Sequence, residues 1–304
     1  NYEVWKEVRE KIKENIEKKK LSSNITTIIL ILIFLVGLSV MLYPTVSNYI
    51  NQRHQSKAIA AYDEKVSEMK PEDYTKYFEA AEKYNKKLAK NPSAFYNPDE
   101  IKGYEKILDI SGTGIMGYIT IKKLGVELPI YHGTGDEVLQ KAAGHLEGSS
   151  LPIGGESTHA VISAHRGLPS ASLFTDLDQL EIGDHFLIHV LDETLCYEVD
   201  QILVVDPEDT SALAVEDGED LVTLLTCTPY GVNTQRLMVR GHRVPYEEQA
   251  VADEQTPLSG FSLHTNYLLW VVVGIVITGV FILILFIREK KLQKKAAKQK
   301  ESEE

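Results

Sequence analysis

The chain has 304 residues, of which 43% are hydrophobic and 25% charged, and its net charge at neutral pH is −12. The excess of acidic residues argues against a nucleic-acid partner, because binding to phosphate backbones needs a basic surface.

Two uncharged and strongly apolar runs lie near the two ends of the chain, at residues 25–43 and 267–287. At about 1.5 Å per helical residue, each run is long enough for the hydrocarbon core of a bilayer. Buried core helices of this length would carry polar positions. No small-residue cleavage site follows the first run, which argues against a signal peptide. We therefore expect two transmembrane helices.

Basic residues flank these runs on their outer sides. Residues 1–20 hold seven Lys or Arg and residues 288–304 hold seven more, whereas residues 44–266 hold 18 basic and 35 acidic residues. Positively charged flanks remain on the cytoplasmic side of a membrane. We expect a cytoplasmic N-terminus over residues 1–24, a basic cytoplasmic tail over 288–304, and an extracellular region between the spans of this cell-membrane protein.

The residues that follow the first apolar run predict helices. Over residues 44–90, apolar side chains recur every three or four positions, and Pro71 divides the segment into two amphipathic helices. Residues 91–114 contain several Pro and Gly, which predicts an irregular loop with at most a short helix near residues 101–108.

Residues 115–246 change to short β-rich runs separated by turns, without long helices between them. This pattern predicts a mainly β domain that is a closed barrel or a sandwich. The runs are MGYITI, VELPIY, HAVISAH, HFLIHVL, LCYEVDQILVV, LVTLLTC and RLMVRGHRV. The polar and unpatterned residues 247–266 predict a linker to the second span.

Only two cysteines are present, Cys196 and Cys227. Cys196 lies in an alternating segment, where a buried apolar side chain is the ordinary explanation, although a disulfide with Cys227 is the alternative. Acidic clusters at residues 206–209 and 217–220 lack the spaced pattern of a calcium loop, and no other metal or cofactor motif occurs. We therefore expect neither a metal nor a cofactor.

Cys227 ends an alternating run in which Thr223 and Leu225 share its face, and Pro229 cannot continue the strand. Arg236 opens the next run after a short loop. Strands joined in this way are most simply antiparallel neighbours, whose opposed side chains are about 5 Å apart. The spacing therefore predicts that Arg236 lies beside Cys227.

A thiol with an ordinary pKa of about 8.5 needs a base or a cation to act as a nucleophile near neutral pH. Among nine histidines, His165 ends a run in which Ser163 shares its face, and a turn follows. His145 is the second candidate. Spacing alone leaves open that these cysteine and histidine side chains are structural.

The segment TLLTC at residues 223–227, followed by Arg236, matches the Thr-Leu-x-Thr-Cys signature and trailing arginine of sortases, the cell-wall transpeptidases of Gram-positive bacteria. The similarity covers about residues 104–246 and resembles the pilus-building class C in particular. Two spans, a basic tail and two helices before the β domain also fit that class. The segments that carry the resemblance are IYHGT, GHLEGSSLPIGG, SAHRGLPSASLFTDLDQLEIGD and TCTPYGVNTQRLMVRGHR.

This resemblance implies a closed β-barrel of about eight strands with the site at its rim. It implies that Cys227 attacks the Thr–Gly bond of a Leu-Pro-x-Thr-Gly-like sorting signal, with His165 as general acid and base and Arg236 stabilising the oxyanion. The acyl group would pass to a lysine amine of another pilin subunit. The residues expected to support this site are Thr226, Ser163 and Thr228.

Two features depart from the family pattern. The family usually has Thr-Gly before the histidine, where this chain has Ser163-Ala164. Many pilus sortases also cover their site with a lid bearing Asp-Pro and an aromatic residue, which residues 85–115 lack. The nearest segment is SAFYNPDE, so the candidate lid residues are Phe95, Tyr96 and Pro98.

Two alternatives stay open. A housekeeping sortase would attach surface proteins to the peptidoglycan precursor, although such enzymes usually have a single anchor. A non-catalytic docking module with the same fold would need no Cys, His and Arg together.

Overall fold

The computed structural model describes residues 2–246, 272–284, 287–288 and 290–291. The chain divides into two compact units, which are described separately. One unit comprises Pro44–Ser259 and holds the β domain. The other comprises Asn1–Tyr43 and Gly260–Glu304 and holds the apolar runs.

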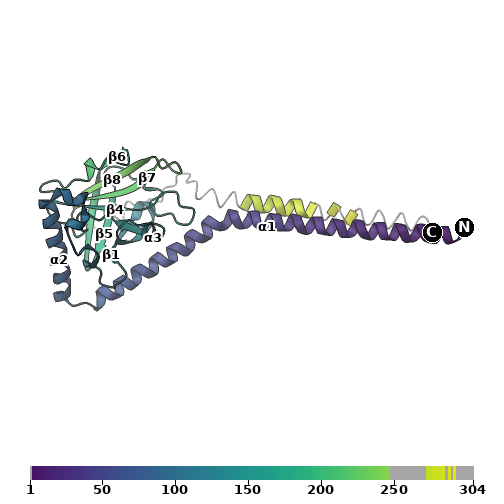
Figure 1. The fold of residues 1–304 in the computed structure, drawn as a ribbon, viewed down its shortest axis with the longest axis horizontal. Coiled ribbons are helices and arrows are strands. Elements are labelled where there is room, and N and C mark those ends of the chain that lie inside the picture. The colour runs from purple at the N-terminus through teal and green to yellow at the C-terminus, as the bar shows by residue number, and fades with distance from the viewer. Residues whose placement is uncertain (1, 247–271, 285–286, 289, 292–304) are drawn as a thin grey trace. The chain divides into compact units, whose positions relative to one another are not determined.

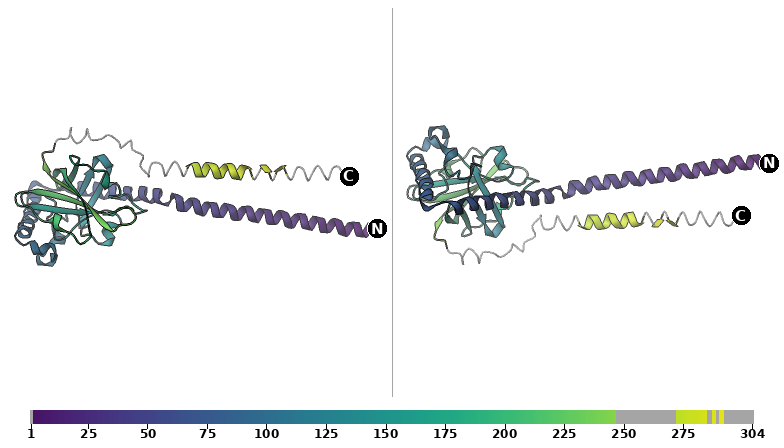
Figure 2. Two further views of the ribbon diagram at one scale, coloured as in Figure 1. Left: turned by 90° about the horizontal axis from the view of Figure 1, so that it is seen from above. Right: turned by 90° about the horizontal axis from the view of Figure 1, so that it is seen from below.

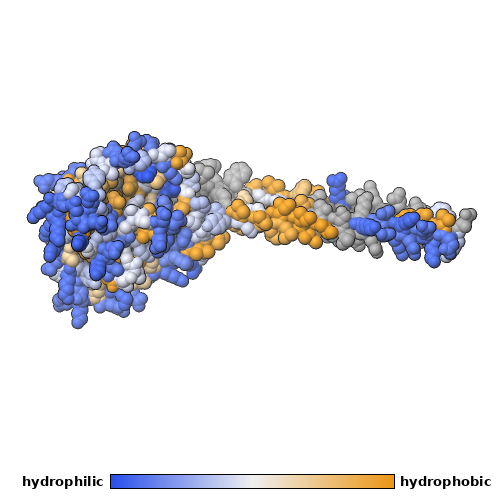
Figure 3. All heavy atoms as spheres, viewed as in Figure 1, coloured by the Kyte–Doolittle hydropathy of each residue, from blue (hydrophilic) through white to orange (hydrophobic). Residues whose placement is uncertain are grey.

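Helix α1 (Tyr2–Glu68) contains the first apolar run. It is the one helix among the described residues that is long and apolar enough to cross a membrane, and apolar side chains are exposed along it (Figure 3). Of the second predicted span, the structure describes an apolar helical stretch over Val272–Ile284, and residues 267–271 and 285–286 lie outside the described residues. The predicted linker 247–266 and most of the tail lie outside the described residues.

The division of the helical segment at Pro71 is confirmed. Helix α1 ends at Glu68, and helix α2 (Pro71–Lys90) begins with the proline at a position where its missing N–H is not needed. The buried face of α2 includes Tyr84, Asn85 and Leu88, and α2 lies beside the barrel (Figures 1 and 2).

Three 3₁₀ turns interrupt the loop that follows α2. They are η1 (Pro92–Phe95), η2 (Pro98–Glu100) and η3 (Tyr104–Lys106). The prediction of an irregular segment is thus confirmed, and the short helix expected near residues 101–108 is a single turn.

Eight strands close into a barrel in the order β1-β2-β3-β4-β7-β8-β6-β5. The sequence predicted seven of them and missed β3, which has only three residues. A short helix, α3 (Asp136–Leu139), lies between β2 and β3. The strands are β1 (Ile115–Ile121), β2 (Val126–His132), β3 (Ala143–His145), β4 (Thr158–Ser163), β5 (His185–Val190), β6 (Glu193–Val205), β7 (Asp220–Thr228) and β8 (Gln235–Val244).

Two of the strand pairs are parallel, β2 with β3 and β4 with β7, and the others are antiparallel. Parallel neighbours point the same way, so β4 and β7 end at the same edge of the barrel. Strand β8 returns antiparallel from β7 and therefore begins at that edge.

The two faces of β4, β7 and β8 pack against different residues, because successive side chains of a strand alternate between faces. Ile162, Leu224 and Val239 belong to the main core. The opposite face carries a second group, which we call the outer apolar cluster. It comprises Val161, Leu213 and Met238, with Phe95, Leu146, Leu203, Val205, Ala212 and Leu225 packed against them.

Asn85 fastens α2 to the barrel. Its amide nitrogen donates to the carbonyl of Leu151 at 3.1 Å, and its amide oxygen accepts from the Leu151 N–H at 2.7 Å. Both groups are buried.

Replacing this side chain leaves two buried backbone groups without partners, so we expect Asn85→Ala to lower the free energy of unfolding by about 2–4 kcal/mol. Urea unfolding of a fragment of residues 44–266, followed by circular dichroism, measures the change. Lys83→Ala, on the exposed side of the same helix, is the control and should change stability by less than about 0.5 kcal/mol. Equal effects of the two substitutions would contradict this role of Asn85.

Candidate active site

Cys227 and Arg236 are direct partners in the antiparallel pairing of β7 and β8. The loop between the two strands, residues 229–234, is exposed, and the free thiol of Cys227 is half-buried. The prediction that Arg236 lies beside Cys227 is therefore confirmed at the level of strand register.

His165 reaches the same edge from β4. Ser163 pairs with Leu225 across the parallel strands, and the Ala164 N–H donates to the Leu225 carbonyl at 3.2 Å. Cys227 follows Leu225 by two residues on the same face of β7, and His165 follows Ser163 by two residues, just beyond the end of β4. The end of β4, the end of β7 and the start of β8 therefore bring residues 165, 227 and 236 to the same edge of the barrel.

The guanidinium group of Arg236 is half-buried and contacts the backbone beside it. Its Nη1 donates to the carbonyls of Gln235 at 3.2 Å and Asn233 at 3.5 Å. Within the part of the chain that the structure describes, no carboxylate forms an ion pair with Arg236. The cation therefore keeps its charge available for an anion at this edge.

The three supporting residues take different roles. Thr226 is buried, and its hydroxyl donates to the Ala164 carbonyl at 2.7 Å, which ties β7 to the residue before His165. Ser163 pairs with Gly144 of β3. Thr228 accepts a hydrogen bond from Arg166 at 3.1 Å.

The sequence analysis did not predict a role for Arg166 at this site. Its side chain is 8% exposed and bridges Thr228, beside Cys227, to Asp178, while its Nε has no partner among the described residues. Arg166 follows His165 directly, so this bridge fixes the backbone on both sides of the site. The sequence signal that could have indicated this role is a basic residue between a histidine and a glycine in a strongly acidic domain.

Two amide side chains of α1 hold the loop that follows His165. The Asn51 Nδ2 donates to the Ser170 carbonyl at 2.7 Å, and the Ser172 N–H donates to the Asn48 Oδ1 at 2.8 Å. The same loop returns to the site where the Phe174 N–H donates to the His165 carbonyl at 3.1 Å. Neither amide was predicted, because the contacts join residues more than a hundred positions apart.

The candidate lid residues lie along the face that carries Cys227. Phe95 packs in the outer apolar cluster with Leu225, which precedes Cys227 by two positions on the same face. Tyr96 is 70% exposed, and its hydroxyl shares a hydrogen bond of 3.1 Å with Thr210. Pro98 opens η2. Among the described residues, none of the three bonds to Cys227.

Two other sequence candidates are structural. Cys196 is 1% exposed and neither cysteine forms a disulfide, so the prediction of a core cysteine is confirmed and the disulfide alternative is wrong. His145 is fully buried, where its Nε2–H donates to the Ser150 carbonyl at 2.7 Å and its Nδ1 accepts from the Tyr104 hydroxyl at 2.9 Å. Burial lowers the pKa of His145 to about 4.

The acidic clusters that the sequence singled out also make protein contacts. Asp220 accepts hydrogen bonds from the Gly155 N–H at 2.8 Å and the Tyr197 hydroxyl at 2.9 Å. No three His, Cys, Asp or Glu side chains gather at metal-binding distance in the described ranges.

The family model for the sortase domain matches residues 119–244. The chain is similar to sortase C1 from Streptococcus agalactiae, with 49% identity and a TM-score of 0.58, over 63% of this chain and 100% of that structure. The chain belongs to the sortase family. A structure of Streptococcus pneumoniae sortase C, whose description concerns catalysis and pilin substrate specificity, is 46% identical with a TM-score of 0.58, over 62% of this chain and 97% of that one.

These neighbours group this sortase with class C. Sortase D from Bacillus subtilis is a more distant relative, with 31% identity over 131 residues. That alignment covers 42% of this chain and 63% of the relative's length.

The buried His145 makes the stability of this sortase depend on pH. Its folded pKa of about 4 lies below the ordinary value of 6.5, so the neutral form is favoured by folding. The stabilisation is complete above pH 6.5 and is lost as the pH falls toward 4, by about 3 kcal/mol if His145 acts alone. Burial also lowers the pKa of His159 and His189, which act in the same direction.

We expect His145→Gln to flatten this dependence, because glutamine does not titrate. Urea unfolding of residues 44–266 at pH 7.5 and 5.0 gives the loss of stability for each form. The difference between the loss in the original chain and the loss in the variant gives the contribution of His145, because the other titrating groups are common to both. Equal losses in the original chain and the variant would contradict the burial of a neutral His145.

Proposed function

We propose that this sortase is a cysteine transpeptidase in which Cys227, His165 and Arg236 carry the reaction. The observation that supports this most directly is the pairing of a half-buried Cys227 with Arg236, at the edge of the barrel where β4 ends two residues before His165. A non-catalytic docking module would need neither an accessible thiol nor an arginine without a carboxylate partner beside it.

The first half of the reaction breaks the Thr–Gly bond of a Leu-Pro-x-Thr-Gly-like sorting signal. The thiolate of Cys227 adds to the threonine carbonyl, and the oxyanion of the tetrahedral intermediate lies toward Arg236. Protonated His165 donates its proton to the departing glycine amine. The C–N bond breaks and a thioester links the threonine to Cys227.

The second half transfers the acyl group. The nitrogen of the incoming neutral amine adds to the thioester carbonyl, and neutral His165 accepts the one proton that this nitrogen loses. A second tetrahedral intermediate, again stabilised by Arg236, then expels the Cys227 thiolate. The new amide is an isopeptide bond when the amine is a lysine side chain.

For the acceptor we propose a lysine of another pilin subunit, which makes the enzyme a pilus polymerase. The similarity to sortase C structures over their whole length supports this choice over a housekeeping sortase, whose acceptor is a peptidoglycan precursor. Both acceptors are amines, so the chemistry at Cys227 is the same for the two.

We further propose that the chain is anchored through residues 25–43 and 267–287, with both termini in the cytoplasm. Residues 44–90 and 91–114 then precede an extracellular catalytic barrel of residues 115–246. The apolar window of α1 and its exposure support the first anchor.

We expect Cys227→Ala to abolish cleavage of a fluorogenic sorting peptide, because no other nucleophile is in place. Arg236→Gln should lower kcat by about 10²–10³-fold, since a single oxyanion donor typically contributes this much. Arg243→Gln, on the same strand but far from the edge, serves as the control and should retain most activity. Turnover by Cys227→Ala equal to that of the unaltered chain would rule out the proposed chemistry.

We propose that Phe95 covers part of the apolar surface to which the Leu-Pro residues of the substrate bind. We expect Phe95→Ala to lower the KM for the sorting peptide several-fold, because the surface no longer has to be uncovered. Tyr96→Phe removes only the hydrogen bond to Thr210 and should change the KM less. An unchanged or raised KM for Phe95→Ala would exclude a covering role.

A further inference from the structure

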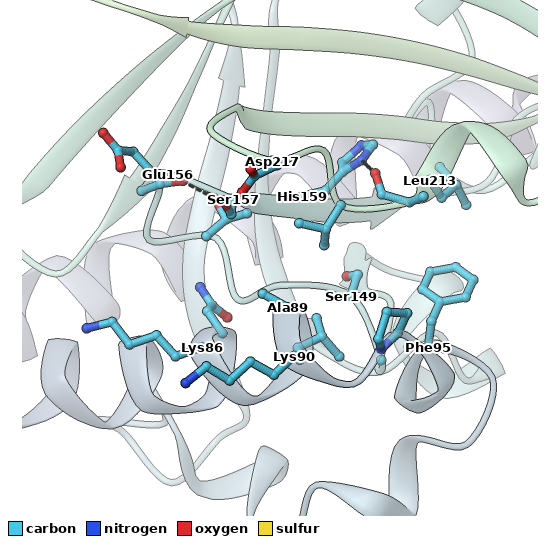
Figure 4. A pocket seen from close by; sticks show the side chains of 18 of the residues that line it. Lys86, Ala89, Lys90, Phe95, Ser149, Glu156, Ser157, His159, Leu213 and Asp217 are labelled. Carbon is cyan, nitrogen blue, oxygen red and sulfur yellow. Dashed lines mark hydrogen bonds between the residues drawn. The ribbon is translucent and has the colours of Figure 1, made fainter.

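A cavity of about 1080 Å³ lies between α2 and the connection from β6 to β7. Its lining does not include Cys227, His165 or Arg236. In Figure 4, Lys86, Ala89 and Lys90 of α2 lie along one side, and Glu156 and Asp217 lie along the other.

The cavity and the candidate active site share one face of the barrel. His159, Val161 and Ser163 alternate along β4 toward the same side, and His165 follows two residues after the end of this strand. The bond of 2.7 Å between His159 Nε2 and the Thr223 hydroxyl confirms that this side is also the Cys227 face of β7. His159 lines the cavity, while His165 lies at the other end of this face.

The outer apolar cluster connects the two places. Phe95 and Leu213 belong both to this cluster and to the lining of the cavity. Leu225, also in the cluster, lies two residues from Cys227. A row of apolar side chains therefore extends from the Cys227 thiol along the strands to the cavity. In the opposite direction, β7 leads into the exposed loop of residues 229–234.

The length of this path matches a stretch of substrate. Leu221, the partner of His159 in β7, precedes Cys227 by six residues, which is about 20 Å at roughly 3.3 Å per strand residue. In an extended sorting signal with its threonine at Cys227, the leucine lies three residues back and its side chain reaches the outer apolar cluster. The residue three positions before that leucine is then level with His159.

We propose that the cavity binds the polypeptide segment that precedes the sorting motif in the acyl donor. This inference rests on the proposed transpeptidase function and extends the bound substrate beyond the motif. The residue three positions before the leucine enters the cavity, and an aromatic or other large apolar side chain is favoured there. Apolar lining residues supply the contacts, among them Phe78, Leu88, Ile153 and Leu213.

Gly148, Gly154 and Gly155 contribute backbone to the wall of the cavity. The charged groups lie on both sides and with both signs, Lys86 and Lys90 against Glu156 and Asp217, so neither an acidic nor a basic ligand is selected by net charge. Apolar contact is therefore the main source of selectivity.

Two labelled peptides test this proposal by fluorescence anisotropy. Both carry Leu-Pro-Ala-Thr-Gly preceded by Ala-Ala, with either Phe or Ala at the third position before the leucine and the fluorophore at the C-terminus. The protein is the full chain with Cys227→Ala in detergent micelles, so binding is measured without turnover. We expect the Phe peptide to bind with a dissociation constant roughly tenfold lower than the Ala peptide.

Two substitutions on α2 locate the preference. Ala89 is exposed and lines the cavity, so Ala89→Trp fills it and should bring the ratio of the two dissociation constants near one. Lys87 is exposed on the same helix but does not line the cavity, so Lys87→Trp should retain the tenfold ratio. Unchanged binding of the Ala peptide in both variants shows that the fold and the motif site are intact.

Equal dissociation constants for the two peptides in the parent protein overturn the proposal. A preference that persists in Ala89→Trp, or failure of both peptides to bind, also overturns it. Turnover of the same peptides by the unaltered chain and by Cys227→Ala is measured separately. Equal turnover in those two proteins rejects the proposed function itself, whereas Cys227-dependent turnover without the Phe preference rejects only the upstream site.

Discussion

The parallel pairing of β4 with β7 is the constraint on which the candidate active site depends. Because the two strands run the same way in register, Ser163 at the end of β4 pairs with Leu225, and His165 and Cys227 each follow two residues later. The Thr226 hydroxyl on the Ala164 carbonyl locks the strands together at that point. A shift of one residue would turn one of the two side chains to the opposite face.

Sequence reasoning succeeded where the relevant contacts are local. Alternation within a strand and a short loop placed Arg236 beside Cys227, and the proline at residue 71 marked the helix boundary. It could not derive the neighbours of β4, because β4 and β7 are separated by two other strands in the chain and pair only through the closed topology. Three-residue β3 gave no periodic signal at all.

The residues that hold the site in place were harder to find. The bonds from Asn48 and Asn51 to the loop after His165 span 124 and 119 residues, and amides on a helix look like ordinary solvent-exposed positions. The bridge made by Arg166 depends on Asp178 and Thr228 arriving from two different segments. Such contacts can be identified only from the structure, whereas the nucleophile and its neighbours in the chain form a short sequence motif.

The contrast between the two cysteines has a practical consequence. Cys196 is enclosed in the barrel wall and Cys227 is open to solvent at the rim, so the folded protein presents a single sulfur to a thiol reagent. The stoichiometry of labelling then counts working sites in a preparation. Oxidation of the Cys227 sulfur gives a sulfenic acid, which oxidises further or condenses with a thiol of another molecule, since Cys196 is buried.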